Sequence, residues 1–226
     1  MAENDQPLLM SVRQEQGAVF LALSTGEVFE LAPDSVPDRL PQAGECVDSP
    51  LLLEIQMAAE RKGIARRLFT LLDRRLQPVA RVREKLLAEG FSSQGIDAVL
   101  EQMTAQGIYS DRTFAEAWCR DCLLTRAVGR NYLISKLRAK KVPGPVAANA
   151  AQEVLDPVRE AELAHHAAAQ KWSKSSGRTG QVGGPDRKAE AKVIRFLQGR
   201  GFSIGLAVKA TRDTKPGMES DMEYEG

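Results

Sequence analysis

The spacing of hydrophobic residues changes near residue 50 of this 226-residue chain. Before that point, Ala18–Leu23 and Val28–Leu31 are short apolar runs separated by a Gly-containing turn, which predicts two paired strands. A two-stranded hairpin alone is only marginally stable in water. We therefore expect the hairpin to recruit a third strand near Glu45–Asp48 or to pack on the first helix.

After residue 50, apolar positions recur every three or four residues, which is the spacing of one helical face. Pro, Gly and capping residues separate the predicted helices. The helices are expected at about residues 51–76, 78–89, 93–105, from 111 through Leu123, 130–140, 143–154, 157–172, 187–198 and 204–211. The predicted fold is therefore mostly α, with a small strand region at the N-terminus.

One sequence pattern recurs in the helical part with a period of roughly 50 residues. A basic helix ends in a Lys-Leu or Phe-Leu pair and a short turn at residues 83–92, 134–143 and, more loosely, 194–203. Such self-similarity is typical of stacked helical units that are each too small to bury an apolar face alone. Tandem units of this kind make an elongated surface, which suits a long partner better than a small substrate.

These observations predict a division of the chain into an N-terminal region, three helical repeats and a tail. The N-terminal acidic β-strand region covers residues 1–50, and the repeats cover residues 51–107, 108–155 and 156–212. Within the third repeat, the Gly/Ser-rich residues 173–186 are expected to form a flexible insertion. Residues 213–226 are expected to be a disordered acidic tail.

Charge is segregated along the chain, although the formal net charge is only +1. Residues 1–50 carry a net charge of −7, residues 51–212 of +12 and residues 213–226 of −4. A basic region between acidic ends indicates a surface that faces a polyanion. The alternative is an ordinary solvated helical face, although such faces usually carry acids as well.

The cations gather in two stretches, residues 61–85 and residues 122–152, and the second contains no Asp or Glu. Helical spacing places Lys136 and Lys140 on one face, one turn apart. Such a stripe can contact successive phosphates, and because Tyr132 is the only candidate for base stacking, we expect contacts to the backbone rather than to base edges. The candidate nucleic-acid-binding and filament-binding residues are Arg74, Arg75, Arg81, Arg83, Arg126, Arg130, Lys136, Arg138, Lys140 and Lys141.

The sequence contains no recognisable catalytic or metal-binding pattern. Cys119 and Cys122 fall on the apolar stripe of a predicted helix beside Trp118, so we interpret them as buried, inert thiols rather than a redox or zinc site. His165 and His166 are the only histidines and diverge by about 100° on a helix, so they cannot share a site. We expect no enzymatic activity, no catalytic residues, no cofactor and no bound metal.

Other sequence features suggest where the protein is located. No apolar run approaches the ~18 residues of a membrane span. The N-terminus lacks the basic region of a signal peptide, and three cysteines are too few for a disulfide framework. We expect a cytoplasmic monomer that does not contact membranes.

Several segments of the chain together resemble one known family. They are Arg67–Leu72, Val82–Phe91, Ile96–Leu100 and Gly107–Trp118, and the last resembles the motif Gly-Tyr-(Leu/Ile)-(Asp/Asn)-Asp-x-x-(Phe/Tyr)-Ala. Gly129-Arg130 and residues 133–141 resemble Gly-x-x-x-Ile-x-x-Glu-Leu-x-x-Lys-Gly. These motifs resemble those of the RecX family, bacterial regulators of the RecA recombinase, over about residues 60–210.

Two departures from the family's motifs fall in the second repeat. Lys136 stands where an acid is common, and Lys141-Val142-Pro143 replaces a typical Lys-Gly-(Ile/Val). Both departures fall on residues that belong to the candidate site, so the detailed contacts cannot be carried over from the family.

The resemblance implies three tandem three-helix repeats in an elongated, curved arrangement. It also implies binding along the RecA filament on single-stranded DNA, with reduced recombinase, ATPase and co-protease activities. The implied partners are the RecA filament and single-stranded DNA, with duplex DNA as a further option through the basic face. The biological setting would be DNA repair, recombination and the SOS response.

A second hypothesis remains open from the residues alone. Helices 78–89 and 94–105 are joined by a short Gly-containing turn and could act as a helix-turn-helix pair. The protein would then be a stand-alone nucleic-acid-binding module, which should show a strong preference among duplex sequences.

Overall fold

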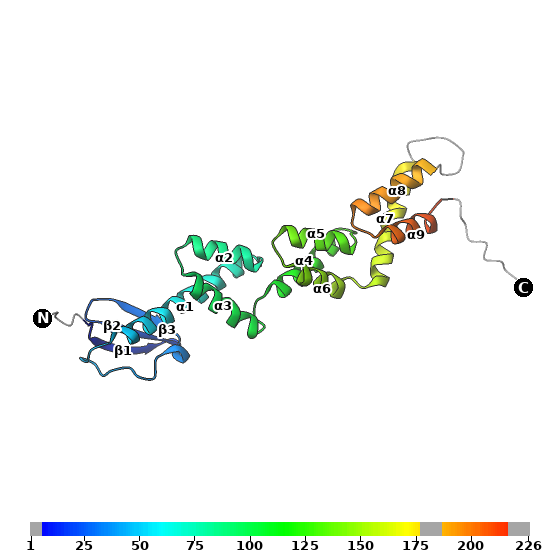
Figure 1. Ribbon diagram of the computed structural model, residues 1–226. Helices are drawn as coiled ribbons and strands as arrows, with labels where there is room; N and C mark the ends of the chain where they lie inside the picture. Colours follow the sequence, from blue (N-terminus) through cyan, green and yellow to red (C-terminus); the bar gives the residue numbers. More distant parts are fainter. Residues whose placement is uncertain (1–5, 177–186, 217–226) are drawn as a thin grey trace, which may run out of the picture. The chain divides into compact units, whose positions relative to one another are not determined.

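The computed structural model describes residues 6–176 and 187–216 of the chain. The chain divides into two compact units, Met1–Ser110 and Asp111–Gly226. The described residues form nine α-helices, a short 3-10 turn at Pro33–Ser35 and one three-stranded sheet (Figure 1). The predicted fold class, mostly α with a small N-terminal strand region, is confirmed.

The sheet of the first unit is antiparallel and has the order β1 (Leu9–Glu15), β2 (Ala18–Leu23) and β3 (Val28–Leu31). The two predicted strands are β2 and β3. The third strand is β1 and not the segment near Glu45–Asp48, which forms only an isolated bridge between Cys46 and Leu8. That segment is nevertheless held to the sheet, because the Leu9 N–H donates to the Glu45 carbonyl at 2.9 Å.

Helix α1 (Ser49–Arg74) belongs to two hydrophobic cores. Its first turn is capped by Asp48, whose carboxylate accepts a hydrogen bond from the Leu51 N–H at 2.8 Å. Its N-terminal half buries Leu51 and Ile55 against the sheet, so packing of the strands on the first helix is confirmed. Its C-terminal half buries apolar residues that include Leu68 against α2 (Val79–Ala88) and α3 (Ser93–Ala105).

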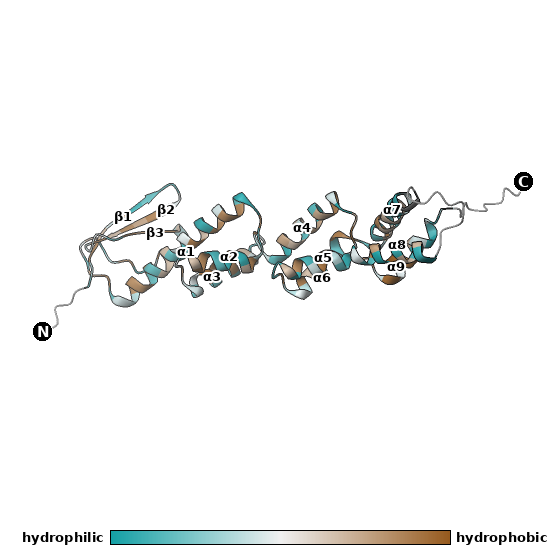
Figure 2. Cartoon of the chain, turned by 90° about the horizontal axis from the view of Figure 1, so that it is seen from above, coloured by the Kyte–Doolittle hydropathy of each residue, from teal (hydrophilic) through white to brown (hydrophobic). Residues whose placement is uncertain are grey.

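The second unit contains two helical triplets. Helices α4 (Asp111–Thr125), α5 (Arg130–Ala139) and α6 (Gly144–Val154) share one core, and α7 (Pro157–Ser176), α8 (Arg187–Gly199) and α9 (Ile204–Asp213) share another. Figure 2 shows that hydrophobic and hydrophilic residues are interspersed along these helices, as the 3.6-residue spacing predicts. We call α4–α6 the second repeat and α7–α9 the third; the first comprises the C-terminal half of α1 with α2 and α3.

Two predictions for the third repeat and the tail fall partly outside the described residues. Helix α7 continues past Trp172 to Ser176, so the first four residues of the predicted insertion are helical. Residues 177–186 of that insertion and residues 217–226 of the predicted tail lie outside the described residues.

The same turn ends the second helix of every repeat. Gly90, Lys141 and Gly201 have φ of +93°, +68° and +82°. In each turn the N–H of the following residue bonds the carbonyl five residues earlier, which in the three repeats belongs to Leu86, Leu137 and Leu197 at 3.1 to 3.3 Å. This is the Schellman pattern of a helix end, in which a left-handed residue satisfies the last carbonyls. The turns therefore align the three repeats residue by residue.

Candidate nucleic-acid interface

The four candidate cations of the first unit do not have equivalent surroundings. Arg74 and Arg75 at the end of α1 and Arg81 on α2 are exposed. Arg83 instead joins α2 to α3: its Nε lies 2.8 Å from Asp97 Oδ1, and its Nη2 donates to Ser93 Oγ at 2.6 Å. These contacts raise the pKa of Arg83 and lower that of Asp97, chiefly through the hydrogen bond between the two side chains. Arg83 therefore has a structural partner, whereas the other three point to solvent.

Arg130, at the first position of α5, is also engaged within the fold. Its Nη2 donates to the Leu155 carbonyl at 2.9 Å and lies 3.6 Å from Glu160 Oε2. The other carboxylate oxygen of Glu160 accepts the Arg130 backbone N–H at 2.7 Å and so caps the start of α5. The Arg130 side chain is only 28% exposed. Its main contacts therefore join α5 to α7, and little of it is open to a binding partner.

Lys136 and Lys140 lie one turn apart on the side of α5 that faces α4. The Lys136 ammonium lies 5.4 Å from the centroid of the Tyr132 ring, and the Lys140 ammonium lies 5.7 Å from that of Trp118. Arg126, just after α4, donates from Nη1 to the Tyr132 hydroxyl at 3.1 Å. A ring attracts a cation without neutralising its charge. These three cations and two rings form what we call the α4–α5 cationic surface, and none of the three cations has an ion-pair partner among residues 6–176 and 187–216.

The remaining two candidates lie elsewhere on α5. Arg138 is about 200° round the helix from Lys136 and lines a hollow of about 450 Å³ with Asn131, Ile134 and Ser135. Lys141 is exposed in the left-handed turn that ends the helix. The structure thus brings Arg126, Lys136 and Lys140 together and leaves Arg138 on a separate face.

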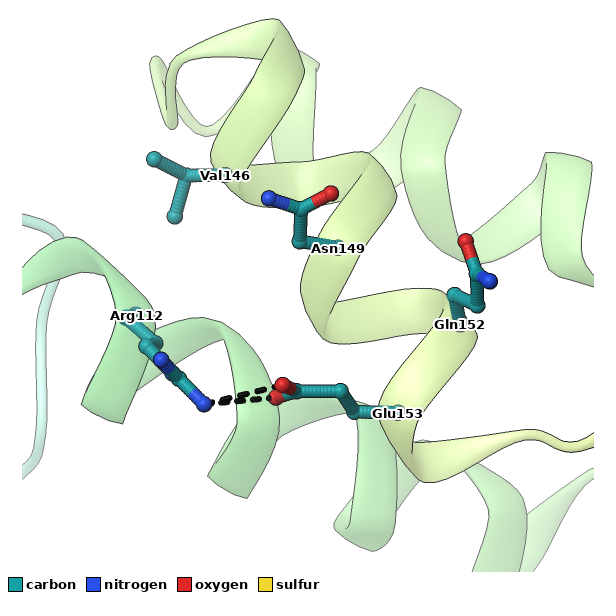
Figure 3. Close-up of a pocket in the computed structure, with 5 residues that line it drawn as sticks. All are labelled: Arg112, Val146, Asn149, Gln152 and Glu153. Atoms are coloured by element: carbon teal, nitrogen blue, oxygen red, sulfur yellow. Dashed lines mark hydrogen bonds and ion pairs between the residues drawn. The ribbon is translucent and has the colours of Figure 1, made fainter.

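A second hollow, of about 510 Å³, lies between α4 and α6. Arg112 of α4 and Glu153 of α6 point toward each other there, with an Nη2–Oε1 distance of 2.9 Å (Figure 3). Arg112 also pairs with Glu116 at 2.8 Å, and this hydrogen bond is the main cause of the lowered pKa of Glu116. The two charged groups that line this hollow, Arg112 and Glu153, are therefore paired with each other.

Of the two thiols of the second repeat, Cys119 is buried, as its place on the apolar stripe predicts, whereas Cys122 is only half-buried. Burial raises the pKa of Cys119 to about 12, and burial also raises the pKa of Cys122. Thiols with raised pKa values are poor nucleophiles. Within residues 6–176 and 187–216, no group of three His, Cys, Asp or Glu residues is placed to hold a metal ion, and no helix is long and apolar enough to cross a membrane.

The third repeat contains a cluster of cations that the sequence analysis did not identify. Phe196 of α8 has the Lys171 ammonium 5.1 Å and the Arg200 guanidinium 4.6 Å from its ring centroid. The aligned turns place Phe196 at the position of Lys136, and Arg200 at that of Lys140. Only the alignment of the repeated sequence pattern could have pointed to this cluster from the sequence. Lys171 comes from a different helix, so the spacing of residues within α8 gave no sign of its contact with Phe196.

Comparison with known proteins gives concordant results. Residues 159–211 match the family description "RecX, third three-helix domain". The regulatory protein RecX of Corynebacterium efficiens is 30% identical over 157 residues, which cover 69% of this chain and 74% of that protein. The regulatory protein RecX of a Thermus thermophilus strain is 32% identical over 142 residues, which cover 63% of this chain and 85% of that protein.

Solved structures agree on the fold. A crystal structure of regulatory protein RecX matches with a TM-score of 0.69 at 19% identity, covering 92% of this chain and 99% of that one. RecX from Lactobacillus salivarius matches with a TM-score of 0.60 at 16% identity, covering 70% and 97% of the two chains. The structural likeness establishes the fold, the sequence relatives establish the family, and the chain belongs to the RecX family of regulatory proteins.

Proposed function

We propose that this protein is a non-enzymatic regulator that binds along the RecA filament on single-stranded DNA and lowers its recombinase, ATPase and co-protease activities. Membership of a family of regulatory proteins supports the regulatory role. The observation that carries the proposal is the α4–α5 cationic surface, in which Lys136 and Lys140 are held over aromatic rings. A filament on DNA is a long polyanion, and such a surface suits it.

The proposed contact set differs from the full group of candidate cations. Lys136, Lys140 and Arg126 form its centre, and Arg138, Lys141 and the exposed arginines of the first unit are further proposed contacts. We place Arg83 and Arg130 outside it, because each is tied to a carboxylate within its own unit. Replacing either would act first on the fold.

The proposal is tested by the DNA-dependent ATPase of RecA. Increasing amounts of the purified protein should reduce ATP hydrolysis by RecA on single-stranded DNA, and raising the salt concentration should relieve the effect. An unchanged ATPase and unchanged strand exchange at low salt would refute the proposed function.

A pair of matched variants separates the cationic surface from general charge. Lys136→Gln/Lys140→Gln should inhibit RecA more weakly than the wild type. Lys209→Gln/Arg212→Gln removes the same charge from exposed positions on α9 and should inhibit normally. If both double variants behave alike, the α4–α5 cationic surface has no specific role.

A further inference from the structure

One face of α8 carries a row of exposed cations. The helix contains four cations and a single acid, Glu190. Three of the cations, Lys188, Lys192 and Arg195, are exposed. Successive residues of a helix are about 100° apart, so these three lie within about 60° of one another round the axis. We call them the α8 stripe.

The α8 stripe lies opposite the buried side of its helix. Val193 and Leu197 are fully buried in the core of the third repeat. They are about 140° and 180° round the helix from Lys188. Glu190 is also about 160° from Lys188, and it lies 2.5 Å from the Lys215 ammonium. No acid of α8 is therefore placed to neutralise the stripe.

The neighbouring helices leave this charge uncompensated as well. Glu160 of α7 is engaged with Arg130, and Asp213 at the end of α9 lies 3.0 Å from His165. Within residues 6–176 and 187–216, none of the three stripe cations has an ion-pair or hydrogen-bond partner. The α8 stripe is therefore open to an anionic occupant.

The residues that follow Pro216 carry the matching charge. Residues 217–226 lie outside the described residues, and their sequence contains four acids and no Lys or Arg. The acids occupy every second position: Glu219, Asp221, Glu223 and Glu225. In an extended chain, side chains two residues apart point the same way and are about 6.6 Å apart. An extended segment of this sequence would therefore present its acids along one edge.

The last described residues place the start of this segment beside α8. The ion pair of Lys215 with Glu190 holds the chain near the first turns of that helix. A segment of this length can reach at most about 33–36 Å. Half the girth of a helix about 10 Å across is about 16 Å, and Lys188 and Arg195 are about 10 Å apart along the axis. The segment is therefore long enough to pass round α8 and to lie along the stripe.

We propose that residues 217–226 bind back onto the α8 stripe, with Asp221, Glu223 and Glu225 against its three cations. The contact goes beyond the proposed function, because it needs neither RecA nor nucleic acid. It makes the segment an intramolecular competitor for any anionic partner of the third repeat. Exposed ion pairs are weak one by one, so the contact depends on several pairs and on the short tether, and salt screens it.

The test is carbodiimide cross-linking of the full chain, which couples a carboxylate to an amine only where the two are in contact. Mass spectrometry of the digested protein then identifies the coupled residues. At low salt, Lys188 and Lys192 should couple to the segment about fivefold or more over Lys209, because three ion pairs act together on the stripe. Lys209 is an exposed lysine on α9 and is nearer to the segment in sequence. At about 1 M salt the preference should disappear, since the screening length falls to about 3 Å.

Variants of Arg195 test whether charge causes the contact. Arg195→Gln should reduce coupling at Lys188 and Lys192 severalfold. Arg195→Lys keeps the charge and should preserve coupling at both lysines, with additional coupling at its own position. The matched control, Arg212→Gln, removes one exposed cation from α9 of the same repeat and should leave coupling unchanged. Circular dichroism should be the same for all three variants.

Three outcomes would overturn the contact. The first is equal coupling at Lys188, Lys192 and Lys209, which would show that the segment has no preferred place on the third repeat. The second is an equal loss of coupling in Arg195→Gln and Arg212→Gln. The third comes from a mixture of isotopically labelled and unlabelled chains: products that join one of each would show that a second copy supplies the segment.

Discussion

Replacing Gly129 with serine tests two opposing effects on stability: the preference for serine as a helix N-cap and the close backbone contact between Gly129 and Gly201. Gly129 is the N-cap of α5, with φ of −87° and ψ of 169°, a conformation open to any residue. Serine is a better N-cap than glycine by a few tenths of a kcal/mol, so local rules predict a small gain in stability. In the structure, however, the new Cβ would lie 2.5 Å from the Gly201 oxygen and 2.6 Å from the Phe202 nitrogen.

These distances determine how far the free energy of unfolding should fall in Gly129→Ser. Non-bonded atoms are most stable at about 3.5–4.0 Å, so the two backbones must separate by about 1 Å. Overpacking of this kind costs about 1–3 kcal/mol. The hydrogen bonds that the start of α5 donates to the Arg200 and Gly201 carbonyls lengthen as well, and each contributes about 1 kcal/mol. We expect the free energy of unfolding to fall by about 3 kcal/mol in Gly129→Ser.

Urea denaturation followed by tryptophan fluorescence measures this change. Both tryptophans, Trp118 and Trp172, belong to the second unit, so the signal reports on the unit that contains the contact. With a slope of about 1–3 kcal/mol per molar urea, the midpoint should fall by about 1–3 M. Gly205→Ala is the matched control, because no atom lies within 4 Å of its added Cβ, and its midpoint should be unchanged or higher. A midpoint for Gly129→Ser at or above that of the wild type would refute the close contact.

Three further predictions concern single side chains. Lys141→Gly should raise the free energy of unfolding by about 1 kcal/mol, because φ of +68° suits glycine; a lower urea midpoint would contradict this. Iodoacetamide at about pH 8 should modify the exposed Cys46 while Cys119 stays unmodified, because burial raises the pKa of Cys119 to about 12; equal labelling in peptide mass spectra would contradict this. Arg83 lowers the pKa of Asp97, so their pairing stabilises the fold above the unfolded pKa of about 3.9 and ceases to do so as pH falls through the lower folded value. Asp97→Asn should therefore lower the thermal midpoint by circular dichroism at pH 7 but not near pH 2, and an equal effect at both pH values would exclude the ion pair as its cause.

Two features of the structure were missed in the sequence analysis. The hairpin was expected to recruit a third strand near Glu45–Asp48 or to pack on the first helix; it packs on that helix, but Leu9–Glu15 supplies the third strand. That strand pairs with β2 across the two-residue turn Gln16-Gly17, a local signal that the sequence analysis did not use. Arg83 and Arg130 were grouped with the exposed cations because helical phase shows on which side a residue lies but not which carboxylate from another helix meets it there.

The sequence by itself determined the helices, their ends and the repeat. Helix ends follow from local hydrogen bonding: Asp48, Ser92 and Ser203 cap the helices that follow them, and glycine favours the left-handed turns. Because these interactions span only a few residues, most predicted bounds lie within two or three residues of the observed ones. The basic character of the second repeat was equally plain, since charge is a property of composition.

Only the tertiary structure decided which cations lie together. The end-to-end contact of α8 with α5 joins residues about 70 positions apart in the sequence, and it depends on two glycines whose backbones touch. The pairing of Lys140 with Trp118 and of Lys171 with Phe196 likewise brings together different helices. Local sequence fixes the direction in which a side chain leaves its own helix, whereas its neighbours are fixed by how the helices pack.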